Sequence, residues 1–103
     1  MPQDVMHDFG VWLRLVQLGH TPPSAKHWHG AGPGVYELRE HGPGTTYRLV
    51  YWPCFDSVVY VLHCFQKKSH YKDETPARDV AAVIKHLRIA KDDYARTYAS
   101  KKK

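Results

Sequence analysis

Apolar side chains recur every three or four residues in two segments, one near each end of the chain. The first segment runs from Gln3 to Leu18 and ends before Gly19, and the second runs from Pro76 to about Tyr98. This period places apolar residues on one side of a helix, so we predict an amphipathic helix over each segment. The apolar stripe comprises Val5, Phe9, Trp12, Leu13 and Val16 in the first helix, and Val80, Val83, Ile84, Leu87, Lys91, Tyr94 and Tyr98 in the second.

Three shorter runs between the helices alternate as β-strands do. They cover Val35–Glu40, Tyr47–Trp52 and Val58–Phe65, with Gly and Pro in the turns between them. Because short connections favour antiparallel neighbours, we predict a three-stranded meander. The third run is apolar on both faces, which predicts a central strand and an inert, buried thiol at Cys64. The predicted fold class is α+β, a small antiparallel sheet packed by an N-terminal and a C-terminal helix.

Composition places the chain among small globular proteins. It has 103 residues, of which 43% are hydrophobic and 24% charged, and we assign one domain to residues 1–98 and a basic tail to residues 99–103. No apolar run approaches the roughly 20 residues that span a bilayer, and the N-terminus lacks the pattern of a secretory signal. The two cysteines form no CxxC pair. We therefore expect reduced thiols, no membrane partner and a cytoplasmic protein.

Positive charge is concentrated in the second part of the chain. The formal net charge is +5, and eleven of the 15 Lys and Arg follow residue 65, against five of the 10 Asp and Glu. A basic half on a small domain favours a polyanionic partner, with nucleic acid as the first candidate. The alternative is a solvated helix face followed by a charged tail.

Two arginines carry the most specific chemical signal. Arg39 and Arg48 lie on adjacent predicted strands, each opposite its strand's apolar face. Antiparallel pairing can bring them together on one exposed face, where two guanidinium forks would form a phosphate clamp. The alternative is a pair of ordinary cross-strand ion pairs with Glu37 and Glu40.

A basic segment follows the third predicted strand. Lys67 and Lys68 stand at the strand end, with His70 and Lys72 just after them. Ammonium groups there would stabilise charge that develops on a phosphorane-like transition state, and one lysine or His70 could exchange the proton. The alternative is a solvated basic loop.

The eight histidines raise the question of a metal. His27 and His29 are the tightest pair, and their i, i+2 spacing lets both face one ion in an extended segment. No second pair stands at ligand spacing and no carboxylate joins them, so we expect no metal and no other cofactor. His63 lies in an apolar run, which favours a hydrogen-bonded core histidine. Ser57, Ser69 and Cys54 lack the setting of a nucleophile.

Several motifs together resemble a RelE/HigB-type toxin of type II toxin–antitoxin systems, in the phage-derived branch of the RelE/ParE superfamily. The resemblance covers nearly the whole chain, from about Met1 to Tyr98. The motifs YELR, TYRLVY, LHCFQKKS and TP carry it, within Ser24–Lys26, Gly34–Arg39, Thr46–Tyr51, Val59–Ser69 and Thr75–Pro76.

The resemblance implies a RelE-like fold and a metal-independent endoribonuclease, an mRNA interferase that cuts mRNA on the ribosome. By position it implies a catalytic surface and one further RNA-binding lysine. The implied partners are mRNA, the ribosome and a cognate antitoxin with a helix-turn-helix domain. The matching positions are Arg39, Arg48, Lys67 and Lys68 for catalysis and Lys26 for RNA binding. His70 as a catalytic residue and Lys72 as an RNA-binding residue are added from their residue types in the basic segment.

Two departures from the family pattern leave alternatives open. Relatives begin with a strand before the helix that starts here near Gln3, so we expect an uncovered sheet edge through which two copies could form a homodimer. His70-Tyr71 replaces a glycine-containing turn, which leaves the general acid and base unassigned. The main rival function is a non-enzymatic protein of the same fold, either a topoisomerase poison or an inactive relic that binds antitoxin or nucleic acid. A histidine-rich metal-binding module is a further rival.

Overall fold

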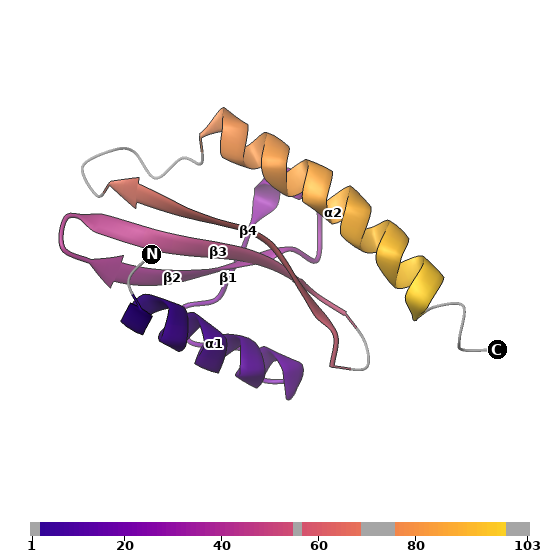
Figure 1. The fold of residues 1–103 in the computed structure, drawn as a ribbon, viewed down its shortest axis with the longest axis horizontal. Coiled ribbons are helices and arrows are strands. Elements are labelled where there is room, and N and C mark those ends of the chain that lie inside the picture. The colour runs from indigo at the N-terminus through magenta and orange to yellow at the C-terminus, as the bar shows by residue number, and fades with distance from the viewer. Residues whose placement is uncertain (1–2, 55–56, 69–75, 99–103) are drawn as a thin grey trace.

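The computed structural model describes residues 3–54, 57–68 and 76–98. One helix at each end of the chain flanks a single antiparallel sheet (Figure 1). The elements are α1 (Gln3–Gln17), β1 (Lys26–His27), the short 3-10 helix η1 (His29–Ala31), β2 (Tyr36–Gly42), β3 (Thr45–Pro53), β4 (Val59–Lys68) and α2 (Ala77–Thr97).

The sheet has the order β1-β2-β3-β4, with every neighbouring pair antiparallel. The predicted meander is present as β2, β3 and β4, and the small α+β fold is confirmed. The two-residue strand β1 adds a fourth strand that the sequence analysis missed. Such a strand is too short to show an alternating pattern, and its pairing with β2 defines it.

The central position predicted for the last strand is wrong, because β4 lies at one edge of the sheet within the described residues. Both faces of β4 are apolar because each contributes residues to one of the two apolar clusters. Leu62 and Phe65 pack under α2, whereas Val59 packs in the cluster on the α1 side. Cys64 is exposed rather than buried.

The two helices cover opposite faces of the sheet, and each face has its own apolar cluster (Figure 1). This division follows from the alternation of side chains along a strand. On the α1 side the buried residues are Val5, Phe9, Leu38, Leu49 and Tyr51. On the α2 side they are Trp28, Val35, Val50, Leu62, Phe65, Val83, Leu87 and Ala90.

Helix α1 ends within one residue of its predicted end, and Gly19 terminates it. Gly19 adopts φ 89°, a left-handed conformation that other residues adopt at a cost. Its amide donates to the carbonyl of Val16 (3.0 Å), and the amide of His20 donates to that of Leu15 (2.9 Å). These two bonds form a Schellman motif, which turns the chain back toward the sheet.

Helix α2 begins directly after Pro76, close to its predicted start, and buries Val83, Leu87 and Ala90. The predicted stripe is partly wrong, because Ile84 is 48% exposed. No helix in the described ranges is long and apolar enough to cross a membrane.

Candidate functional site

Arg39 and Arg48 are direct cross-strand partners in the β2–β3 register. The register therefore confirms that antiparallel pairing places the two arginines opposite each other. Arg48 and Val50 are two residues apart in β3, so they lie on the same face of the sheet. Val50 belongs to the α2-side cluster, so the arginine pair lies on the face of the sheet that packs against α2.

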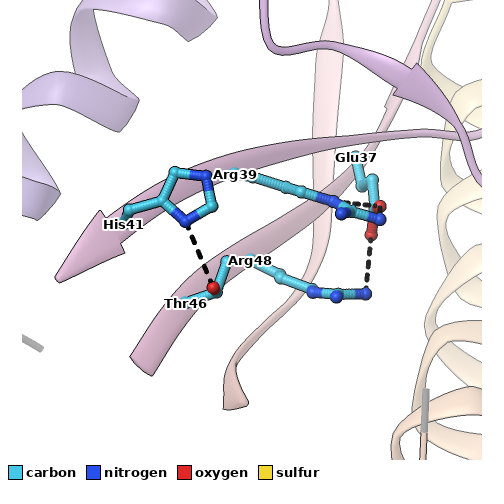
Figure 2. A network of polar contacts seen from close by, with 5 residues as sticks. All are labelled: Glu37, Arg39, His41, Thr46 and Arg48. Carbon is cyan, nitrogen blue, oxygen red and sulfur yellow. Dashed lines mark hydrogen bonds and ion pairs between the residues drawn. The ribbon is translucent and has the colours of Figure 1, made fainter. Parts of the chain in front are cut away.

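Both guanidinium groups converge on the carboxylate of Glu37 (Figure 2). Arg39 donates from Nε to Oε1 at 2.8 Å, and its Nη2 lies 2.7 Å from the same oxygen. Arg48 Nη1 lies 3.8 Å from Oε2. Two like charges directly opposite each other are destabilising by themselves, and the shared carboxylate offsets this repulsion.

The expectation of an exposed arginine pair is half wrong. The Arg48 side chain is only 5% exposed and Glu37 only 4%, whereas Arg39 is 21% exposed. Burial in this polar cluster makes Arg48 a source of fixed positive charge, and Arg39 is the member of the pair that a ligand can reach. The three groups together carry one net positive charge.

Glu40, the other carboxylate considered for ion pairing, faces the opposite side of the sheet. It accepts a hydrogen bond from the indole Nε1 of Trp12 on α1 at 2.8 Å. The ion-pair alternative therefore holds for Glu37 and not for Glu40. The reason is the strand period of two, which puts residues 37 and 39 on one face and residue 40 on the other.

His41, which follows the predicted strand Val35–Glu40, extends the same face. His41 belongs to β2, and its Nδ1 lies 3.3 Å from the hydroxyl Oγ1 of Thr46 on β3 (Figure 2). It follows Arg39 by two residues and is exposed. An imidazole can accept or donate a proton near neutral pH. The alternation of Glu37, Arg39 and His41 is the signal that could have found it.

Three of the predicted lysines lie on strands of the sheet that carries this cluster. The backbone of Lys26 in β1 pairs with that of Glu37, and the side chain of Lys26 is exposed. Lys67 pairs with Thr46 and Lys68 pairs with Thr45. The side chains of these two lysines, and the whole of His70 and Lys72, lie outside the described residues.

Cys54 and His63 are partly buried residues with local polar contacts. Burial raises the pKa of Cys54 to about 11, which keeps the thiol protonated near neutral pH. His63 is partly buried with its Nε2 2.8 Å from Asp79 Oδ1, as expected of a hydrogen-bonded core histidine. Within the described ranges, no three His, Cys, Asp or Glu side chains gather to form a metal site.

Comparison with known proteins identifies the family. Residues 1–92 match the family model described as phage derived protein Gp49-like (DUF891). The chain belongs to this family. Gp49-like proteins are phage-derived and often toxin-like. This agrees with the resemblance of the sequence to a phage-derived toxin. No curated protein and no solved structure matches the chain.

Proposed function

We propose that this Gp49-like protein is the toxin of a type II toxin–antitoxin pair and a metal-independent endoribonuclease that cleaves mRNA on the ribosome. The observation that supports the proposal is the cross-strand arginine pair, oriented by Glu37, on a chain of a toxin-like family. A guanidinium fork matches the oxygens of a phosphodiester, and strands hold such groups more rigidly than loops do.

The proposed reaction is a transesterification within RNA. The 2′-oxygen of one nucleotide attacks the adjacent phosphorus, and the bond from phosphorus to the 5′-oxygen breaks. A base on the protein takes the 2′-hydroxyl proton, and an acid gives a proton to the 5′-oxygen, so no proton is consumed overall. The products are a 2′,3′-cyclic phosphate and a 5′-hydroxyl. Cationic side chains stabilise the extra negative charge of the transition state.

Arg39 and Arg48 differ in solvent exposure, so we propose a different role for each. Arg39 would contact the phosphate oxygens directly, because its side chain is the more exposed of the two. Arg48 is a positioning residue that acts through Glu37 and adds positive potential beneath the phosphate. Lys67 and Lys68 would stabilise the transition state from the end of β4.

We assign proton transfer to one of Lys67, Lys68 or His70, and we add His41 as a further candidate. His41 is two residues from Arg39 on the same face of β2, and it is exposed to an incoming substrate. Lys26 would hold the RNA backbone, together with Lys72. The backbone of Lys26 pairs with that of Glu37, which places β1 beside the arginine pair.

Cleavage of mRNA by purified variants in excess chelator tests these roles. Arg39→Ala should lower the cleavage rate by at least about a hundredfold, because one lost electrostatic donor typically costs 10²–10³ in rate. Arg14→Ala is the matched control, since Arg14 is an exposed arginine on α1 outside the cluster. Normal cleavage by folded Arg39→Ala would contradict the assignment.

One observation favours the non-enzymatic alternative. The Glu37 carboxylate already forms ion pairs with both arginines. The same ion pairs would form if the cluster served only to stabilise the sheet. In that case the protein would bind its antitoxin or a nucleic acid without cutting RNA. Wild-type protein that is folded and binds RNA, yet leaves it intact with and without ribosomes, would select this alternative.

The proposed partners also include a helix-turn-helix antitoxin and a second copy of the chain. Family membership suggests the antitoxin. The long edge strand β4 offers backbone groups for pairing, and Val61 on this strand is 49% exposed. We expect a homodimer through β4, and Val61→Lys should shift its mass in multi-angle light scattering to that of a monomer. Action on mRNA and ribosomes implies a cytoplasmic location.

A further inference from the structure

Four aromatic rings form a row that crosses the β1 edge of the sheet. The rings of His29 and His27 stack with centroids 5.8 Å apart and planes 16° apart. His27 lies 4.5 Å from Tyr36, and Tyr36 lies 5.9 Å from Tyr51. The two histidines are exposed, whereas Tyr51 is 2% exposed. The row therefore runs from the surface into the α1-side core.

A cavity adjoins the buried end of this row. It has a volume of about 280 Å³ and lies between the C-terminal end of α1 and the sheet. Tyr36 and Tyr51 belong to its wall, and the exposed residues His20 and Thr21 stand at its rim. Tyr36 is thus shared by the aromatic row and the cavity. The mechanism proposed above uses neither feature.

We propose that the aromatic row and its cavity bind one unpaired nucleobase of single-stranded RNA. The inference rests on the proposed function, which makes RNA the substrate. Protein sites that recognise single-stranded RNA stack splayed bases on aromatic side chains and bond the base edges to polar groups. Here the exposed histidines offer ring faces, and His20 and Thr21 offer polar groups at the rim.

The position of the row explains how one RNA strand would reach both sites. Lys26 and His27 are consecutive in β1, so they belong to opposite faces of the sheet. Lys26 pairs with Glu37, on the face of the arginines, and His27 pairs with Tyr36, on the face of the cavity. β1 is the last strand at this edge among the described elements. A strand bound by its phosphates on one face can therefore turn around this edge and place a base on the other.

Fluorescence anisotropy with a labelled, 2′-O-methylated single-stranded RNA measures binding without cleavage. The double variant His27→Ala/His29→Ala should bind about tenfold more weakly than wild type, as the loss of one stacked base predicts. The same oligonucleotide made entirely of abasic sugar-phosphate units should bind the variant and wild type equally. His7→Ala, an exposed histidine on α1 outside the row, is the control and should bind as wild type does. Circular dichroism verifies that each variant is folded.

The outcomes separate this inference from the proposed nuclease activity. Equal RNA affinity of wild type and the double variant, with wild-type cleavage intact, overturns the nucleobase site and leaves the nuclease standing. An equal loss of affinity for abasic RNA also overturns it, because the histidines would then act on the backbone. Base-dependent binding by wild type without any cleavage supports the nucleobase site and counts against the nuclease. Wild type that neither binds nor cleaves RNA overturns both.

Discussion

Replacement of Glu37 by glutamine probes the one carboxylate that the structure shows in contact with both Arg39 and Arg48. Glutamine has nearly the same shape and keeps an oxygen that can accept from Arg39, so the change removes charge and little else. Two guanidinium groups would then face each other across β2 and β3, with Arg48 only 5% exposed to solvent. We expect a large loss of stability.

The magnitude follows from the distances. At an effective dielectric constant of about 20, the gross attraction of Glu37 is about 6 kcal/mol to Arg39 at 2.7 Å and about 4 kcal/mol to Arg48 at 3.8 Å. Desolvation offsets much of this, and breaking a buried pair on one side typically costs about 3–5 kcal/mol. Because glutamine keeps one hydrogen bond, we expect Glu37→Gln to lower the free energy of unfolding by about 3 kcal/mol.

Urea denaturation near neutral pH measures this loss. With a slope of about 1.5 kcal/mol per molar urea, the midpoint should fall by about 2 M. Glu40→Gln is the matched control on the other face of β2, and it should cost less than about 1 kcal/mol because the amide oxygen still accepts from Trp12. The cost of Glu37→Gln should also shrink by about 1 kcal/mol in an Arg48→Met background.

A loss below about 1 kcal/mol for Glu37→Gln would refute the reasoning, as would the same loss in both backgrounds. If the variant stays folded at low urea, the removal of one negative charge should strengthen RNA binding. The salt dependence of that binding should steepen by up to about 0.7 in log–log slope, which corresponds to one more phosphate contact.

Three further predictions concern groups outside the cluster. Trp12→Phe should cost about 1–2 kcal/mol of unfolding free energy in urea, because it removes the indole donor that bonds Glu40; an unchanged midpoint would contradict the bond. Burial, with a smaller contribution from Tyr36, raises the pKa of Tyr51 from its ordinary value of 10.0 to about 12. Stability from this group should therefore be complete below pH 10 and be lost as pH rises toward 12, measured by the melting temperature of wild type against Tyr51→Phe. Alkylation of Cys54, followed by peptide mass spectrometry, should accelerate about tenfold per pH unit up to about pH 11, and a plateau near pH 8.5 would show an ordinary thiol.

The sequence predicts the main elements well because their patterns are long. Two helices of about four and six turns and three strands each repeat their period several times. Strand alternation also predicts the cross-strand meeting of Arg39 and Arg48, since it depends only on register and face. The two-residue strand β1 has no period to detect, and its place depends on tertiary pairing with β2.

The sequence could not predict which sheet residues are buried under the helices and which are exposed to solvent. The apolar composition of β4 indicated a central strand, yet this strand lies at an edge and Cys64 on it is exposed. Arg48 was expected on an exposed face, yet it is buried and paired with Glu37. Burial depends on where α1 and α2 cross the sheet, and one-dimensional periodicity does not contain that information.

The most direct test of the central claim is to identify the ends of RNA cut by the purified protein. A defined mRNA is incubated with wild type or Arg39→Ala in excess chelator, with and without translating ribosomes, and the products are mapped. We expect wild type to leave 2′,3′-cyclic phosphates and 5′-hydroxyls within codons on ribosomes, and Arg39→Ala to leave the mRNA intact. Folded wild-type protein that cuts no RNA, or that produces 5′-phosphate ends, would contradict the account.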